Sequence, residues 1–343
     1  MLPRLRPTTN PYLIMLRSSI EAQPGVTVID FSWSNAFFGR ADVYHAHWPE
    51  ILLTGRTPTR RRVREGLVAA YLTWCAVRGQ ALVRTFHNAE LPSELTGVQT
   101  GLLHVWERAT DLWIVLNPQS QPPGSASRVL IPHGHYRDWY RRDDQPATVP
   151  GRLAFFGLVR RYKGVDRLVR SFREMDDPTN RLSLEVAGKP SSEELSAELE
   201  SLADGDPRVT LDFSFLSDDE IVALVGRAQL VVLPYRQMHN SGGVLTALSL
   251  DRPVLVPDNP VTRQLAQEVG PEWVQTFADE LGREDLDRAL TATASLSGRA
   301  RPDLSQRDWE MSGAEHVRAY RQAVAACRSL GMRGRLSRLR GRG

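Results

Sequence analysis

Two loops in the second half of the chain combine the residue types that bind a diphosphate. In the first, FGLVRRYKG at 156–164, an apolar run ends at Gly157 and is followed by Arg160 and Lys163. Glycine lets a ligand approach the backbone, and the two cations can reach phosphate oxygens. In parallel α/β sheets, ligands bind beyond the carboxyl ends of the strands. The pattern predicts an anion-binding loop, and an ordinary basic surface loop is the competing interpretation.

The second loop follows the apolar run VVLPY and ends in HNSGG at 239–243. Ser241 is a good helix N-cap, and Gly242 and Gly243 keep the first helical turn free of bulky side chains. Free N–H groups there would bind a phosphate, and Asn240 directly precedes them. The alternative is an ordinary capped helix whose glycines permit close packing. Two such loops in one half of the chain favour a single anion site built from both.

Histidines gather near the ends of apolar runs in the first half. They are His45, His47, His87, His133 and His135. A neutral imidazole at a strand end can act as a general base or bind a sugar hydroxyl. Carboxylates that follow two of these histidines are alternatives for the base. The candidate catalytic residues are therefore His47, His87, Glu50 and Glu90. For each histidine, a packed or hydrogen-bonded structural role is the competing interpretation.

Trp48, Asn88 and His135 are candidates for binding an acceptor. Trp48 could stack on a sugar ring, although a core tryptophan fits the pattern equally well. His47 and Glu50 do not form an HExxH motif and no Cys or carboxylate ligand set accompanies them, so we expect no metal site. The chain also lacks a nucleophile elbow, a Walker loop and a GxGxxG motif, which disfavours hydrolase, ATPase and dehydrogenase functions.

The composition is that of an ordinary globular chain with two domains. It has 343 residues, of which 41% are hydrophobic and 24% are charged. The formal net charge of +3 is small, but arginines cluster at 60–64 and 328–342. Such clusters indicate contacts with a phosphate-bearing surface, either membrane or nucleic acid, or else a solvated surface and a disordered end.

The two cysteines, Cys75 and Cys327, are isolated, and nothing in their spacing indicates a disulfide or secretion. Cys75 lies in an apolar helical pattern, which predicts a buried thiol. No apolar run has the length of a membrane span, and the first residues lack a clear cleavage site. We expect a cytoplasmic protein, with peripheral attachment to the inner face of the plasma membrane.

Short apolar runs alternate with helical patterns in both halves, which predicts an α/β fold with parallel sheets. The expected strands are 26–32, 42–48, 81–87, 112–117, 129–132, 153–157, 182–188, 209–213, 230–233 and 254–257. Helices are expected at 64–78, 98–110, 165–175, from about 217, and at 308–326. The polar segment 141–150 is typical of a linker between the two halves.

Several segments of the sequence resemble those of a known family. Two segments resemble the donor-side segments of GT-B glycosyltransferases. The first is FGLVRRYKGVDRLVRSF, and the second runs from VVLPY through the glycine-containing helix start to SLDRPVLVP. HAHWPE, TFHNAELP and IPHGHY resemble the acceptor-side loops of bacterial exopolysaccharide mannosyltransferases of the xanthan type, within the GT4-like group. The resemblance covers residues 10–325.

The resemblance implies a GT-B fold, with two Rossmann-like domains that face a central cleft. Residues 1–145 would bind the acceptor, 151–304 would bind the nucleotide-sugar, 305–327 would cross back to the first domain, and 328–343 would form a basic tail. The donor-binding residues that it implies are Gly157, Arg160, Lys163, Phe215, Leu216, Asn240, Ser241, Gly242 and Gly243. Phe215 and Leu216 would lie near the base. The resemblance also implies that no metal is required. It implies no cofactor either, since the nucleotide-sugar is a co-substrate.

The sequence departs from the family at one place. Retaining enzymes of this type often carry a pair of glutamates around the second loop, and the matching positions here are Met238 and Thr246. Neither side chain can hold a sugar hydroxyl as a carboxylate does. An inverting displacement instead needs a base on the acceptor side, which the first half supplies. Arg160 and Lys163 would then stabilise the leaving nucleoside diphosphate.

The expected function is therefore hexosyl transfer from GDP-mannose or a UDP-sugar to a lipid-linked or polysaccharide acceptor, with inversion. Two alternatives stay open: a non-catalytic protein that binds a glycan or nucleotide, and a nucleotide-sugar epimerase. Nucleic-acid binding is not expected, because the basic tail lacks an interleaved aromatic platform.

Overall fold

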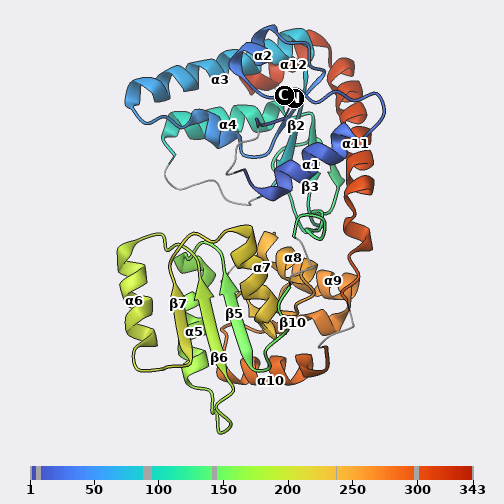
Figure 1. Cartoon of the computed structure of the whole chain (residues 1–343). Coiled ribbons are helices and arrows are strands. Elements are labelled where there is room, and N and C mark those ends of the chain that lie inside the picture. The colour runs from blue at the N-terminus through green and yellow to red at the C-terminus, as the bar shows by residue number, and fades with distance from the viewer. Residues whose placement is uncertain are drawn as a thin grey trace. The chain divides into compact units, whose positions relative to one another are not determined.

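The computed structural model describes residues 2–4, 9–87, 95–140, 145–236, 238–296 and 301–341. The chain forms two compact units: unit 1 comprises Met1–Gly134 and Arg307–Gly343, and unit 2 comprises His135–Gln306 (Figure 1). Residues 135–140 lie upstream of the expected linker yet belong to unit 2. The reason is hydrogen bonding, because the Tyr136 amide donates to Ser249 Oγ at 2.8 Å and the Trp139 indole donates to Asp218 at 2.8 Å.

Unit 1 contains a four-stranded parallel sheet in the order β1-β2-β3-β4. Its strands are β1 Val43–Ala46, β2 Ala81–Phe86, β3 Leu112–Val115 and β4 Ser127–Leu130. Its helices are α1 Pro11–Glu21, α2 Trp33–Phe38, α3 Pro58–Arg78, α4 Gly97–Ala109, α11 Trp309–Ser329 and α12 Gly331–Arg340, with the short 3-10 helix η1 Pro49–Leu53. The 3-10 helix η5 Ser305–Arg307 contains the boundary between the units in the sequence.

Helices cover both faces of this sheet. On one face, Tyr71 of α3 and Trp106 of α4 pack with Tyr44 of β1. On the other face, α11 packs Ala319 and Ala323 against β2 and β3. Both cysteines are buried free thiols, as predicted for Cys75 and found also for Cys327. The last long helix therefore belongs to the core of unit 1, although 172 residues of unit 2 precede it in the chain.

The expected strand at 26–32 is wrong. This segment forms a single isolated bridge, Leu2 to Asp30, and no ladder. Its apolar side chains are used differently, because Ile29 and Phe31 pack against the core that contains Tyr44 and Tyr71. Apolar alternation marks burial of one face, and here that burial is achieved by an extended segment outside the sheet.

Unit 2 contains a six-stranded parallel sheet in the order β10-β9-β8-β5-β6-β7. Its strands are β5 Arg152–Phe156, β6 Ser183–Ala187, β7 Val209–Asp212, β8 Leu230–Val232, β9 Val254–Pro257 and β10 Val274–Phe277. Its helices are α5 Val165–Arg173, α6 Glu193–Ala203, α7 Asp218–Arg227, α8 Gly242–Ser249, α9 Pro260–Val269 and α10 Arg283–Thr293, with 3-10 helices η2 Arg161–Lys163, η3 Pro271–Trp273 and η4 Ala294–Leu296. The α/β prediction is confirmed, and β10 is an addition to it.

The basic end of the chain is not a disordered tail over residues 331–340. These residues form α12, which packs on α3 and α4 (Figure 1). The Arg335 guanidinium donates to the carbonyls of Ala76 at 2.7 Å and Cys327 at 2.9 Å. Arg338 forms an ion pair with the buried Asp111 at 3.1 Å. Two arginines that were expected to face a phosphate surface or water therefore hold the helix in place.

Removing the Arg338 guanidinium should destabilise unit 1. Arg338→Ala leaves the Asp111 carboxylate, which is 4% exposed, without its cationic partner. Because Arg338 is itself 31% exposed, we expect a loss of about 1–2 kcal/mol in the free energy of unfolding, below that of a fully buried pair. Urea denaturation measures the change. Arg333→Ala, at an exposed position of the same helix, is the control, and an equal loss in both variants would contradict the role of the pair.

Candidate functional site

The first loop places Lys163 against the end of β5. Gly157, directly after that strand, has φ of 100°, a conformation that favours glycine. A Cβ at Gly157 would lie 3.7 Å from the Lys163 Nζ. Gly188, at the end of the neighbouring β6, has φ of 139°, and a Cβ there would lie 2.2 Å from the Gly157 carbonyl oxygen. The two strand ends thus leave bare backbone around the ammonium group.

Lys163 is surrounded by aromatic rings as well as by backbone. Its Nζ lies 5.1 Å from the ring centroid of Tyr235 and 5.9 Å from that of Phe155. Burial, and secondarily the nearby Arg160 charge, lower the pKa of Lys163 to about 8. The aromatic faces attract the cation without neutralising it. A cation that is buried beside open backbone in this way can bind an anionic ligand.

Tyr235 connects the first loop to the second. Its ring covers Lys163, and its hydroxyl is hydrogen-bonded to the side chain of Ser241. Ser241 caps α8, because its Oγ accepts from the Val244 amide at 3.3 Å. Two backbone contacts bring the loops together: the Arg236 amide donates to the Tyr162 carbonyl at 2.9 Å, and a Cβ at Gly164 would lie 2.3 Å from the Pro234 oxygen. The two predicted loops therefore lie side by side in unit 2.

The remaining predicted donor residues lie on the same edge of the unit 2 sheet. Phe215 and Leu216 follow β7, and the Phe215 side chain is 76% exposed. Asn240 is half-buried and precedes the cap of α8. Gly242 and Gly243 open α8, and a Cβ at Gly242 would lie 3.4 Å from the Tyr136 hydroxyl. Because β5 and β7 are parallel members of one sheet, their carboxyl ends face the same direction.

Met238 and Thr246 are both buried, with exposures of 8% and 5%. The Met238 carbonyl accepts from the Asn259 side chain at 3.2 Å, and Thr246 is hydrogen-bonded to Tyr140. Both positions therefore serve local packing and hydrogen bonding. Neither brings a negative charge to the second loop.

In unit 1, the structure brings three sequence-predicted residues together. His47 Nδ1 and His87 Nε2 are 3.0 Å apart, and the Trp48 ring stacks on His87 with centroids 4.3 Å apart. The parallel pairing of β1 with β2 explains the contact. His45 is opposite Val83 and Ala46 is opposite Arg84, so the residues just beyond both carboxyl ends are neighbours.

The two imidazoles are neutral near pH 7. Burial lowers the pKa of His47 well below its usual value, and lowers that of His87 to about 3. His47 Nε2 has no hydrogen-bond partner among the described residues. In the tautomer in which His47 Nδ1 donates to His87 Nε2, the His47 Nε2 carries a free lone pair. This arrangement can accept a proton, with His87 fixing the tautomer.

The other predicted residues of this group have different positions. Glu50 lies half-buried in η1, and burial raises its pKa. His135 belongs to unit 2, and its Nδ1 accepts from the Arg137 amide at 3.2 Å, so it is not part of the histidine group of unit 1. Asn88 and Glu90 lie outside the described residues.

Helices α1 and α11 add residues that sequence reasoning did not find. The Tyr320 hydroxyl lies 2.8 Å from His45 Nδ1, and Thr85 Oγ1 lies 2.7 Å from His45 Nε2. The Tyr12 ring contacts both His47 and His87 edge-on. Tyr320 is 275 positions from His45 in the sequence, so no local pattern could have revealed the contact. In unit 2, Tyr235 was visible within VVLPY but carried no assigned role.

Across the described part of the chain, no cluster of three His, Cys, Asp or Glu side chains has the arrangement of a metal site. The helices within those same residues all fall short of the length or the apolar character that a bilayer crossing requires.

Comparison with known proteins identifies relatives across most of the chain. Residues 150–283 match the family described as glycosyl transferases group 1. A protein of Xanthomonas campestris pv. campestris, named GDP-mannose:glycolipid 4-beta-D-mannosyltransferase, is 38% identical over 321 residues. That alignment covers 92% of this chain and 89% of the relative.

Solved structures show the same fold. AviGT4, a glycosyltransferase involved in avilamycin A biosynthesis, matches with a TM-score of 0.59 and 14% identity, covering 92% of this chain and 89% of that one. Anabaena HepE in complex with UDP-glucose matches with a TM-score of 0.53 and 14% identity, covering 78% and 77%. The predicted GT-B fold class is confirmed by these neighbours.

The buried histidines should make the protein sensitive to acid. The folded pKa of His87 is about 3, and those of His133 and His316 are about 4, all below the usual 6.5. The unfolded chain therefore binds more protons below pH 6.5, so stability is fully present above that pH and is lost as the pH falls toward about 4. We expect each histidine to contribute up to about 1.4 kcal/mol per pH unit to the slope.

Urea unfolding at a series of pH values measures this slope. His316→Gln should reduce it by about one proton, whatever its effect on absolute stability. His104→Gln, at an exposed position of α4, is the matched control. An unchanged slope in His316→Gln would show that this ring does not resist protonation in the folded state.

Proposed function

This chain belongs to the group 1 glycosyltransferases of the GT-B fold, and on that basis we propose that it transfers mannose from GDP-mannose to a lipid-linked glycan with a β-linked product. The observation that carries the proposal is the paired loop of unit 2, in which Tyr235 links Lys163 to the capped start of α8. The 38% identity to a protein named as a GDP-mannose:glycolipid 4-beta-D-mannosyltransferase supports the choice of donor and acceptor.

In the proposed donor site, the diphosphate lies between the two loops of unit 2. Lys163 and Arg160 supply positive charge, and the free amides at Gly242 and Gly243 supply hydrogen bonds at the positive end of a helix dipole. Gly157 keeps the backbone open beside the phosphates. Phe215 and Leu216 contact the base in this proposal, and the Phe215 ring is free enough to stack on it.

The proposed reaction is a single displacement at the anomeric carbon. The acceptor hydroxyl oxygen forms a bond to that carbon while the carbon–oxygen bond to the diphosphate breaks, and GDP leaves with the electron pair. The hydroxyl proton passes to the imidazole pair, with His47 Nε2 as the acceptor atom and His87 as its positioning partner. Lys163 and Arg160 stabilise the charge that develops on GDP, so the mechanism that we propose requires no metal.

We further propose that the protein works at an anionic membrane surface, as part of exopolysaccharide assembly. The exposed side of α3 supports this location, because Val63, Trp74 and Val77 are 57%, 36% and 44% exposed and lie on one face of the helix. Arginines flank this stripe at Arg60, Arg62, Arg64 and Arg78. An apolar stripe with a cationic border is typical of a helix that lies in the interface of a bilayer.

Binding of GDP should depend on pH through Lys163. Because the pKa of this lysine is about 8 in the free protein, raising the pH above 8 removes its charge, whereas the phosphates of GDP remain fully ionised. We expect affinity for GDP to fall by up to about tenfold per pH unit above pH 8. Titration calorimetry between pH 7 and 10 measures the profile.

Three variants separate the charge from other effects of the side chain. Lys163→Arg should retain binding without the decline, and Lys163→Met should bind weakly at every pH. Lys189→Met changes the other lysine of the chain, which is exposed after β6, and should behave as the unmodified protein. In the same assay, UDP and ADP test the base; tighter binding of UDP than GDP would contradict the proposed donor.

The stereochemistry of the product tests the reaction itself. With GDP-mannose and a glycolipid acceptor, we expect a β-mannoside by NMR, because one displacement on the α-linked donor inverts the anomeric carbon. His47→Ala and His87→Ala should each lower kcat by about 10²–10⁴-fold while GDP binding is unchanged. An α-linked product would exclude the single displacement.

The carboxylate alternatives provide the control for the base. Glu50→Gln, Glu90→Gln and the exposed His104→Ala should retain most of the activity. Full activity in both His47→Ala and His87→Ala, with its loss in Glu50→Gln or Glu90→Gln, would move the base to that carboxylate.

A further inference from the structure

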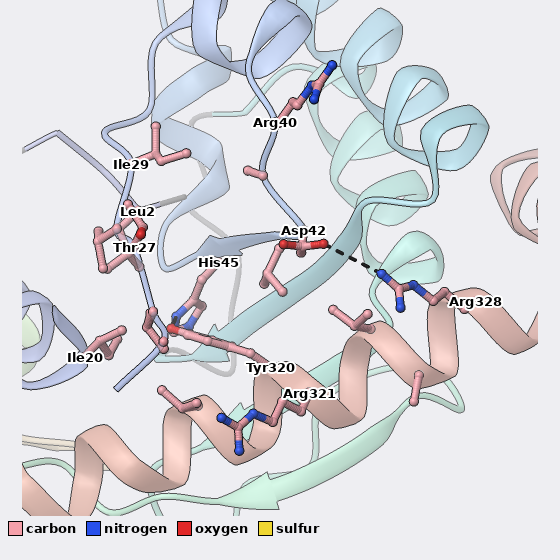
Figure 2. Close-up of a pocket in the computed structure, with 18 residues that line it drawn as sticks. Leu2, Ile20, Thr27, Ile29, Arg40, Asp42, His45, Tyr320, Arg321 and Arg328 are labelled. Carbon is pink, nitrogen blue, oxygen red and sulfur yellow. Dashed lines mark hydrogen bonds and ion pairs between the residues drawn. The ribbon is translucent and has the colours of Figure 1, made fainter. Parts of the chain in front are cut away.

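Unit 1 contains a cavity of about 590 Å³ that the proposed transfer reaction does not use. It lies between the extended segment 25–29, the edge strand β1 and helix α11, and begins at the residues that precede β1 (Figure 2). This volume is within the range of natural ligand pockets. The histidine pair His47–His87 does not line the cavity, although the ring of the lining residue His45 lies 4.2 Å from that of His47.

The walls of this cavity are mainly apolar. They include Ile20, Val28, Ile29, Val43, Val317 and Val324. Tyr320 and His45 also line it, but they form a hydrogen bond with each other, since the Tyr320 hydroxyl and His45 Nδ1 are 2.8 Å apart. The interior therefore offers hydrocarbon surface and few free polar groups, which suits an apolar chain better than a sugar or nucleotide.

Arginines surround the apolar interior. Arg40, Arg321 and Arg328 are exposed residues that line the cavity, and Figure 2 shows them coming from the segment before β1 and from α11. Asp42 is the lining carboxylate, paired with Arg328 at 3.8 Å. That pair is weak, because its side chains are 71% and 81% exposed. The charge around the cavity is therefore clearly positive.

A second hollow of about 470 Å³ continues from the first. The two hollows share Arg40, Ala41, Asp42 and Arg328 in their walls. The second adds Arg78 and Arg335, together with Trp74 from the exposed stripe of α3. The path thus leads from the proposed membrane-facing side of α3, through a group of arginines, to an apolar interior.

We infer that the two hollows form one binding site for a lipid phosphate, with the apolar chain in the first hollow and the phosphate among Arg40, Arg328 and Arg78. Burial of each methylene of such a chain in the apolar hollow favours binding. Arginine is well suited to bind the phosphate through paired N–H donors. Inorganic phosphate alone would leave the apolar interior empty, and an uncharged chain would not use the positive charge of Arg40 and Arg328.

This site goes beyond the proposed transfer reaction, and it does not depend on GDP-mannose being the donor. Two sources share its ligand chemistry: the phosphorylated lipid of a glycolipid acceptor and a phospholipid of the bilayer. Both present an apolar chain that ends in a phosphate. The experiment therefore first tests the shared chemistry and then distinguishes the sources.

Binding to the full chain is measured by titration calorimetry with dodecyl phosphate below its micelle concentration, and with dodecanol and inorganic phosphate separately. We expect saturable binding of dodecyl phosphate, with a Kd at least tenfold lower than that of either partial ligand. Equal affinity for dodecanol, or for inorganic phosphate, would overturn the combined site. So would the absence of saturable binding.

Variants locate the binding. Arg40→Gln and Arg328→Gln should each lower the affinity for dodecyl phosphate about tenfold and leave the affinity for dodecanol unchanged. Arg318→Gln is the matched control, because Arg318 is 70% exposed on the same helix and lies outside both hollows. Thr27 is exposed in the cavity wall, so Thr27→Trp should abolish binding of both dodecyl phosphate and dodecanol. Thr291→Trp, at an exposed position of α10, should not. Full binding by Thr27→Trp would place the ligand elsewhere.

Circular dichroism and thermal unfolding confirm that each variant is folded. Farnesyl phosphate and vesicles containing phosphatidylglycerol then distinguish the sources. Tighter binding of farnesyl phosphate than of dodecyl phosphate indicates the isoprenoid carrier of an acceptor, and vesicle binding that Thr27→Trp reduces indicates a bilayer phospholipid. GDP titration of the same variants separates this site from the donor site, because failure of lipid binding with normal GDP binding overturns only the lipid site.

Discussion

The parallel register of neighbouring strands is the constraint on which both groups of candidate functional residues depend. In unit 1, Ala46 pairs with Arg84, so the chain leaves β1 and β2 at the same edge and His47 meets His87. In unit 2, Leu153 pairs with Leu230, so the loops after β5 and β8 leave together and Gly164 meets Pro234. In both units, backbone pairing of the strands thus brings together the loops that carry the candidate side chains.

Burial then sets the charge state of what the register assembles. Desolvation is the largest cause of the lowered pKa at Lys163 and at every histidine of the unit 1 group. Desolvation disfavours the charged form in both cases, so it favours the neutral imidazole and it lowers the pKa at which the ammonium group loses its proton. One physical effect therefore keeps the imidazoles of unit 1 neutral and lowers the pKa of the lysine in unit 2.

Sequence patterns were sufficient to place residues in the loops next to strand ends. Gly157, Lys163 and Ser241 were found from strand–loop–helix patterns, and the contact of His47 with His87 follows once β1 and β2 are neighbours. Contacts made by α11 and α12 were not predictable, since Tyr320 and Arg335 reach partners more than 250 positions away. The short β10 was missed because VQTF has only two buried residues, and 26–32 was misassigned because packing outside a sheet produces the same alternation.

The missing carboxylates of the second loop and the weakened charge of Lys163 are two aspects of one arrangement. The causes that act on the pKa of Lys163 are burial and the charge of Arg160, and both lower it. Met238 and Thr246 stand where retaining enzymes of the resembled type often carry glutamates, and neither side chain supplies a counter-ion for the lysine. A bound diphosphate would supply that counter-ion, so part of the cost of burying the ammonium group is recovered only when the donor is present. Neither Met238 nor Thr246 can act as a carboxylate in a retaining reaction, which is consistent with the proposal that the base comes from the histidines of unit 1.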